Sequence, residues 1–395
     1  MINKKIAFII FLLAFFLSAF ISYSVLGTSG GNILAPQSKY KPPSQNGSRT
    51  DDSASPNEPK TEECPLNGQL FGESKKERWQ RRRPLGIMVE NHTESRPQSG
   101  LSSADVIYEA VAEGGITRFL AIYYCQDANI VGPVRSARIY FVKALQEYGA
   151  YPLYAHVGGA NTDGPADALG EINELGWGLY NDLNQFGVPF PNFWRDQDRL
   201  KNKDGTQIAT EHTVYTNTSK LWDFAKTKRD LTNIDKKGKS WDATFEKWKF
   251  KDDAKSNERG KIINVSFGFW DLFASDYSVV WNYDVVTNSY KRKNGGSPQL
   301  DKNTGKQMEA KNVVIVFSNE TAVNDGYEKG QHLFYKITGS GNGLVFQDGE
   351  VTKVTWNKKR EEARMKFFDE NGKEVQFVRG KIFIEILPIG NKVTY

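Results

Sequence analysis

Residues 90–141 read ENHTESRPQSGLSSADVIYEAVAEGGITRFLAIYYCQDANIVGPVRSARIYF, and the rest of the chain is expected to hold this segment in place. Residues 104–112 and 116–124 alternate apolar with polar side chains, which predicts two β-strands. The Glu-Gly-Gly sequence between them predicts a hairpin turn, because glycine adopts the backbone angles that a tight turn requires. The segment therefore predicts an antiparallel pair of strands.

The same segment carries charged side chains that form a candidate site for an anionic ligand. Ser136 is expected to cap a helix, and helix N-termini favour anions. Arginines beside a helix N-terminus can hold a carboxylate or a phosphate through paired hydrogen bonds. An internal ion-pair network that locks the fold is the alternative, and the sequence leaves both open. The glutamates are expected to orient the arginines, and Glu109 and Arg118 are expected on one side of a sheet. The candidate ligand-binding residues are Arg96, Arg118, Arg135, Ser136, Arg138, Glu109 and Glu113.

The flanking sequence predicts two folded domains. Residues 84–235 mix strand-like runs, such as 85–90, with helical periods, so we expect an α+β domain there. Residues 236–260 are strongly charged and are interpreted as a connector between domains. Residues 261–395 contain mostly strand-like runs separated by turn sequences such as Asp-Gly and Asn-Gly, which predicts a β-rich second domain.

The N-terminal residues predict a membrane anchor. Residues 6–26 contain no charged side chain and are long enough to span a bilayer as a helix. Lys4 and Lys5 precede this run, so we expect the N-terminus in the cytoplasm and the bulk outside. A cleaved signal peptide is the alternative for residues 1–26. Residues 27–80 are rich in Pro, Ser, Asn and Gly and are predicted to form a disordered stalk.

Composition excludes some classes of partner and leaves one pairing open. The 52 Lys and Arg against 47 Asp and Glu give a net charge of +5, which is too mild for a nucleic-acid partner. Two cysteines cannot form a zinc site by themselves, and no dinucleotide, phosphate-loop or metalloprotease motif is present. We therefore expect no metal and no cofactor. Cys64 and Cys125 could pair in an oxidising compartment, and the sequence does not decide this.

His156 and His212 are the candidate catalytic residues. His156 ends a strand-like run before two glycines, and His212 begins another such run. Either could act as an acid or a base, with Glu109 or Glu113 as its carboxylate partner. The alternative is that both histidines are core residues with satisfied hydrogen bonds.

Several long motifs resemble the YerB-like family of bacterial envelope proteins, and the resemblance covers residues 84–395. The resemblance implies an extracytoplasmic protein with a layered sheet-sheet-helix α+β core and a β-rich C-terminal part, but no known reaction. Family members are often described as lipoproteins. Here no cysteine follows the apolar run, so a transmembrane helix is expected in place of a lipid. The motifs include RPLGIMVEN (83–91), RPQSGLSSADVIYEAVAEGGITRF (96–119), VGPVRSARIYF (131–141), HVGGA (156–160), EHTVYTN (211–217) and GNGLVFQDGEVTKVTW (341–356).

The leading hypothesis is a single-pass cell-membrane protein that binds an anionic small molecule or a cell-wall polymer outside the cell. One alternative is an enzyme, a hydrolase or transferase of wall polymer, that uses the histidines and glutamates named above. The other alternative is a protein–protein adaptor in an envelope complex. The sequence does not identify the ligand, the protein partners or the oligomeric state.

Overall fold

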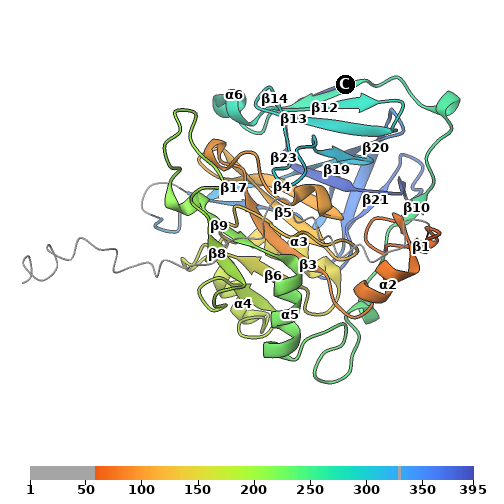
Figure 1. Ribbon diagram of the computed structural model, residues 1–395. Helices are drawn as coiled ribbons and strands as arrows, with labels where there is room; N and C mark the ends of the chain where they lie inside the picture. The colour runs from red at the N-terminus through yellow and green to blue at the C-terminus, as the bar shows by residue number, and fades with distance from the viewer. Residues whose placement is uncertain (1–57, 328–330) are drawn as a thin grey trace, which may run out of the picture. The chain divides into compact units, whose positions relative to one another are not determined.

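The computed structural model describes residues 58–327 and 331–395, and every structural statement below concerns these residues. The predicted membrane anchor over residues 1–26 lies outside them, as does the predicted stalk up to residue 57. Within the described ranges, no helix is both long enough and apolar enough to cross a membrane. The described chain is a mixed α+β fold that is mostly β-structure, as predicted (Figure 1).

A ten-stranded mixed sheet forms the centre of the fold. The hairpin predicted in the opening segment is present, with β4 and β5 antiparallel and a bulge between Val111 and Glu113. β23, from the C-terminal part of the chain, pairs in parallel with β4 and places Ile382 opposite Val106. From edge to edge the strands are β21 (Lys366–Phe368), β20 (Glu350–Lys358), β19 (Gly339–Gln347), β16 (Asn312–Ser318), β23 (Ile382–Pro388), β4 (Val106–Glu113), β5 (Ile116–Tyr123), β3 (Leu85–Glu90), β6 (Leu153–His156) and β7 (Asp182–Asn184).

This pairing shows that one sheet continues across the predicted division between residues 84–235 and 261–395. The two parts are separate along the sequence but not in the fold, because their strands share one sheet. The predicted connector also packs, since β10 (Lys249–Lys251) pairs in parallel with β22 (Gln376–Val378). Trp248, just before β10, is buried and donates its indole N–H to the carbonyl of Met365 at 2.8 Å.

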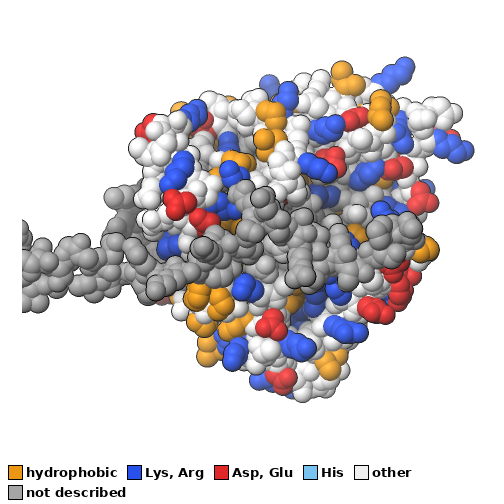
Figure 2. All heavy atoms as spheres, viewed as in Figure 1, with side chains coloured by type: hydrophobic (Ala, Val, Ile, Leu, Met, Phe, Trp, Pro, Cys, Tyr) orange, Lys and Arg blue, Asp and Glu red, His pale blue; other side chains and the backbone are white. Residues whose placement is uncertain are grey.

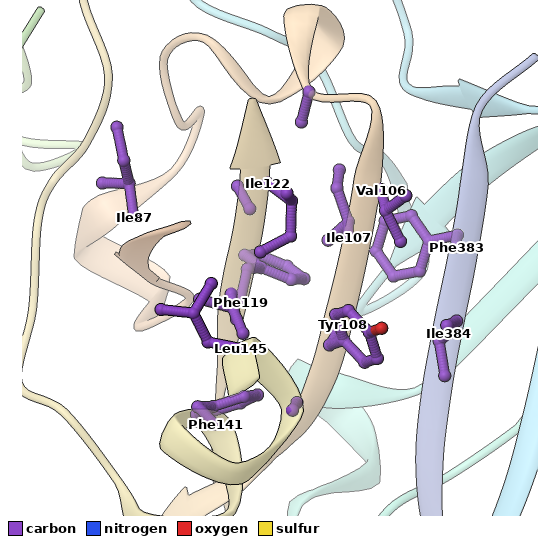
Figure 3. Close-up of a cluster of buried hydrophobic side chains, with 14 of the residues drawn as sticks. Ile87, Val106, Ile107, Tyr108, Phe119, Ile122, Phe141, Leu145, Phe383 and Ile384 are labelled. Carbon is purple, nitrogen blue, oxygen red and sulfur yellow. The ribbon is translucent and has the colours of Figure 1, made fainter. Parts of the chain in front are cut away.

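The central strands are buried on both faces. Successive side chains of a strand point to opposite faces, so β4 and β5 contribute apolar residues to two separate layers. On one face lies helix α3 (Ile139–Leu145), where Leu145 packs so closely over β3 that a Cβ on Gly86 would lie 2.8 Å from its Cδ1. On the other face Phe383 contacts Phe119, with ring centroids 6.0 Å apart, and Figure 3 shows this cluster.

A second, smaller sheet covers the Phe383 face. Trp281 of this sheet packs against Phe383 with ring centroids 5.0 Å apart. The strand order is β14-β13-β12-β11-β24, with β15 pairing with β13. These strands are β14 (Ser297–Pro298), β13 (Ser289–Asn294), β12 (Val279–Asp284), β11 (Asn264–Phe267), β24 (Val393–Thr394) and β15 (Glu309–Ala310).

The remaining helices and short strands lie around these sheets. β8 pairs with β9, and β17 pairs with β18, each antiparallel. Their bounds are β8 (Phe193–Arg195), β9 (Val214–Thr216), β17 (Glu320–Val323), β18 (His332–Tyr335), α4 (Ala168–Glu174), α5 (Thr218–Arg229) and α6 (Ala274–Tyr277).

The predicted stalk is wrong for its last part, because residues 58–80 are folded. They form β1 (Glu62–Glu63), β2 (Leu70–Phe71) and α2 (Glu73–Trp79). A disulfide joins Cys64 to Cys125, with their Cα atoms 6.0 Å apart, so the pairing that the sequence left open is made. Leu66 and Trp79 are buried. The stretch was predicted to be disordered because most of its residues are polar, but a few buried apolar residues and the disulfide attach it to the rest of the fold.

Candidate functional site

The candidate site lies where the carboxyl ends of neighbouring strands of the main sheet come together. β3 and β4 both run antiparallel to β5, so they are parallel to each other, and β6 is parallel to β3. Their carboxyl ends therefore meet at the same edge, with Glu90 ending β3 and Glu113 ending β4. Arg118 lies near the start of β5 and reaches the same edge. The carboxyl ends of parallel strands are where ligands bind in many α/β sheets.

Glu113 is held by two arginines. Its Oε2 lies 3.3 Å from Nη2 of Arg118, and its Oε1 accepts a hydrogen bond from Nε of Arg138. Burial alone would raise the pKa of Glu113, but the charges of the two arginines outweigh it and lower this pKa to about 2. Burial and the charge of Arg138 lower the pKa of Arg118 to about 10, so Arg118 is still charged at neutral pH.

Glu90 is the second acidic centre of the site, and the sequence analysis did not single it out. One carboxylate oxygen accepts a hydrogen bond from Nε of Arg135 at 3.0 Å. The other oxygen lies 2.7 Å from Nδ1 of His212 and 3.2 Å from the hydroxyl of Ser95. Burial would raise the pKa of Glu90, but the hydrogen bond from His212 and the charge of Arg135 lower it. Glu90 thus joins two segments that are far apart in sequence.

Arg135 is the arginine of this cluster that reaches solvent. Its side chain is 26% exposed, against 7% for Arg118 and Arg138. Its Nε is held by Glu90, while its two Nη nitrogens make no hydrogen bond to any described residue. On the face shown in Figure 2, basic and acidic side chains are interspersed over the described surface. The described surface on that face therefore shows no broad basic patch.

Ser136 does not cap a helix, so that prediction is wrong. The chain stays extended as far as Arg138, which is the N-cap residue of α3. Backbone pairing explains this, because the N–H of Arg135 donates to the carbonyl of Met88 and the N–H of Ala137 donates to the carbonyl of Gly158. The carbonyl of Ser136 accepts a hydrogen bond from Arg118 at 3.4 Å.

Two of the predicted site residues lie elsewhere. Glu109 is opposite Phe119 in the β4–β5 pair, whereas Arg118 is opposite Ala110, so Glu109 and Arg118 face opposite sides of the sheet and that expectation is wrong. Arg96 donates to the side chain and carbonyl of Asn91, both at 3.0 Å, and to the carbonyl of Asp276. The structure brings together Arg118, Arg135, Arg138 and Glu113, and adds Glu90 and His212.

Glu109 belongs to a buried charged cluster on the opposite face. It accepts hydrogen bonds from Thr117 at 2.6 Å and from Arg292 of β13. Glu385 of β23 lies 3.5 Å from Nε of the same arginine and accepts the indole N–H of Trp281 at 3.0 Å. Arg292, Glu109 and Glu385 are all fully buried. These contacts join the second sheet to the main sheet and leave Glu109 no route to a solvent-side ligand.

The histidines are held in ways that argue against acid–base catalysis. His156 is fully buried, with Nδ1 2.7 Å from the carbonyl of Gly158 and Nε2 2.6 Å from Asp182. Both ring nitrogens are therefore within hydrogen-bond distance of a protein oxygen, which fixes the orientation of the ring. His212 is 5% exposed and bound to Glu90. Among the described residues, neither histidine forms a hydrogen bond or an ion pair with Glu109 or Glu113, so the predicted catalytic pairs are not assembled.

Replacing Glu113 with glutamine should flatten the acid dependence of stability. The pKa of Glu113 is depressed in the folded chain, so its contribution is present above the unfolded value of 4.5 and is lost as pH falls towards 2. A shift of this size corresponds to about 3 kcal/mol. Urea unfolding at pH 7 and pH 3 measures this contribution to the free energy of unfolding. Glu174→Gln, which changes an exposed glutamate, is the control. An unchanged pH dependence in Glu113→Gln would contradict the assignment.

These features define a class of protein: a disulfide-bonded α+β protein whose mixed sheet carries an ion-paired arginine cluster at one edge. Disulfides persist in oxidising compartments, which is consistent with an extracytoplasmic protein. The chain belongs to the DUF3048 family. Residues 70–232 match the N-terminal domain of this protein family of unknown function, and residues 270–384 match its C-terminal domain.

A curated relative and a solved structure agree with this assignment and confirm the YerB-like resemblance. The chain is 31% identical over 323 residues to the "Putative lipoprotein YerB" of Bacillus subtilis, covering 82% of this chain and 86% of the relative. The crystal structure of the YerB protein from Bacillus subtilis superposes with a TM-score of 0.65 at 29% identity. That match covers 85% of this chain and 100% of the solved chain. The relative's description as a lipoprotein is consistent with association with the cell envelope.

Proposed function

We propose that this chain is a membrane-anchored extracytoplasmic protein that binds an anionic small molecule or a cell-wall polymer at the carboxyl edge of the main sheet. The observation that carries the proposal is Arg135. Glu90 fixes its Nε, while its two Nη nitrogens have no hydrogen-bond partner among the described residues and its side chain is partly exposed. A planar fork held in this way is already oriented for a carboxylate or a phosphate.

The charge balance of the cluster supports the same proposal. Among the described residues, the three arginines Arg118, Arg135 and Arg138 form ion pairs with two carboxylates, those of Glu90 and Glu113. In addition, Nε of Arg118 is buried without a hydrogen-bond partner among the described residues. An anion beside Arg135 would neutralise the excess positive charge in a partly desolvated place, where such an interaction is stronger than in water.

The anchor in this proposal is the apolar run of residues 6–26, with the lysines before it facing the cytoplasm. The wall-polymer hydrolase or transferase draws less support from the structure, because both histidines are committed to other partners. The adaptor would need a continuous apolar surface on the C-terminal part. The exposed apolar side chains there, such as Leu272 and Val286, lie on separate turns.

Arg135→Ala should abolish ligand-induced stabilisation without unfolding the protein. The full chain, in detergent micelles, would be heated with polyphosphate, with peptidoglycan fragments and with simple dicarboxylates. A ligand at a hundred times its dissociation constant should stabilise the wild type by about 2.7 kcal/mol. Arg360→Ala is the matched control, because Arg360 is exposed and lies outside the cluster, with Glu362 at 3.6 Å as its ion-pair partner.

The outcome separates the binding site from a purely structural network. Stabilisation that is lost in Arg135→Ala and kept in Arg360→Ala would support the site and name the ligand class. If none of the three classes stabilises the wild type, or if Arg135→Ala responds as the wild type does, the proposal fails and the arginines are a structural ion-pair network.

A further inference from the structure

Two histidines and a glutamate meet at the surface beside Glu90. His92 precedes the short 3-10 turn Thr93–Ser95, which contains Glu94, and His212 ends the turn Thr210–His212. One ligand atom from each of His92, Glu94 and His212 lies within 4.8 Å of the others. Segments that are far apart in sequence thus place two imidazoles and a carboxylate together.

The pair of His212 and Glu94 has the spacing of two ligands on one metal ion. Nε2 of His212 lies 3.6 Å from Oε2 of Glu94, which is too long for a hydrogen bond. Two ligands bound at about 2.0–2.1 Å in tetrahedral geometry lie about 3.4 Å apart, close to this distance. The side chain of Glu94 is 37% exposed, so an ion can reach the pair from solvent.

Glu90 orients His212 as an outer carboxylate orients a metal-binding histidine. Nδ1 of His212 donates to Glu90 at 2.7 Å, which leaves Nε2 as the nitrogen with a lone pair and directs it towards Glu94. Glu90 is itself fixed by Arg135 and Ser95. Histidine ligands of metal ions commonly donate their other nitrogen to a carboxylate in this way.

We infer that His212, Glu94 and His92 bind a divalent transition-metal ion of the zinc class. Two imidazole nitrogens and a carboxylate suit Zn²⁺ or Co²⁺, whereas Ca²⁺ and Mg²⁺ prefer oxygen ligands alone. Three protein ligands leave a fourth position for water or for a group of a bound molecule. The inference requires no anion at Arg135, which is not a ligand and reaches His212 only through Glu90.

His92 completes the site by rotating its ring. In the structure its ring stacks on that of His212, with centroids 4.5 Å apart and planes 10° apart. Its Nδ1 accepts a long hydrogen bond of 3.3 Å from the N–H of Glu94. The terminal torsion of histidine is broad, so a half-buried ring can turn a nitrogen towards an ion held by the other two ligands.

The test is a titration of the full chain, in detergent micelles and stripped with EDTA, with ZnSO₄ by calorimetry and with CoCl₂ by visible absorption. We expect one zinc ion per chain and the absorption of four-coordinate cobalt. Glu94→Gln and His92→Ala should each weaken zinc binding by more than about tenfold. Glu211→Gln, an exposed neighbour of His212 outside the cluster, is the matched control and should bind zinc as the wild type does.

Melting temperatures measured in EDTA show whether each variant is folded, and they should equal that of the wild type because the changed side chains are not fully buried. Failure of the wild type to bind zinc at a ratio of one to one overturns the inference. Equal zinc affinity in Glu94→Gln, His92→Ala and wild type overturns it as well. Binding that is lost in Arg135→Ala but kept in both ligand variants would place the ion elsewhere and would also overturn it.

Discussion

Replacing Arg292 with methionine should lower the free energy of unfolding by about 3–5 kcal/mol, the cost of breaking a buried ion pair from one side. Arg292 is fully buried and bridges Glu109 of β4 and Glu385 of β23. Its guanidinium also lies 5.1–5.6 Å from the rings of three aromatic residues. Methionine keeps most of the volume, so the loss should come from the carboxylates left without a cation.

The two carboxylates do not contribute equally to this effect. Glu109 accepts a hydrogen bond from Arg292, whereas Glu385 lies 3.5 Å from Nε of the same arginine. Burial and the negative charge of Glu109 raise the pKa of Glu385 well above its usual range. The double variant Arg292→Met with Glu109→Gln should therefore recover part of the lost stability, because it removes the carboxylate that pairs most closely with Arg292.

Urea unfolding at pH 7 measures all of these variants. Lys293→Met is the matched control, since Lys293 is the next residue of β13, points to the opposite face and is partly exposed. A loss of less than about 1 kcal/mol in Arg292→Met would contradict the ion-pair account, as would a double variant that is less stable than the single one.

Replacing both Cys64 and Cys125 with alanine should be the second large effect, with a loss of about 4 kcal/mol. The disulfide closes a loop across a sequence separation of 61 residues, which restricts the unfolded chain. It also fastens the folded segment that contains α2 to the end of β5, where both cysteines are buried. Thermal and urea unfolding with and without a reducing agent measure the loss.

The reducing agent supplies an internal control for this variant. Reduced wild type should unfold at the midpoint of the double variant, and the double variant should not respond to the reducing agent. A wild type that is insensitive to reduction, with both sulfurs free by thiol titration afterwards, would show that the disulfide adds no stability.

The strands of the main sheet were largely predictable from sequence, whereas β13, β14, β15 and β24 of the second sheet were not. The first five residues of β3, Leu85–Val89, are apolar, and a strand of that composition is buried on both sides, as β3 is. β13 was missed because Ser289–Asn294 reads as a polar segment that favours a loop. Its fully buried side chains are Tyr290 and Arg292, and sequence periodicity treats an arginine as a solvent-facing residue.

The candidate site was half predictable, for a reason that lies in the topology. The four residues Glu113, Arg118, Arg135 and Arg138 lie within one short segment, so local reasoning placed them together. Glu90 and His212 meet only because β3 and the turn before β9 come together in the fold, and no local pattern indicates that contact. Glu109 binds Arg292, which is far from it in sequence, so no local pattern predicts this pair. The side of the sheet that Glu109 faces follows from the register of the β4–β5 hairpin.

The position of β23 has a consequence for the newly synthesised chain. A ribosome produces β4 early, but the strand that fills its free edge lies at residues Ile382–Pro388, almost at the end of the chain. Until then the edge of β4 is an open row of backbone donors and acceptors, and open edges invite pairing with other chains. Truncation by even a few tens of residues would leave this edge exposed permanently. A chain that stops before Ile382 should therefore aggregate rather than form a shortened folded protein.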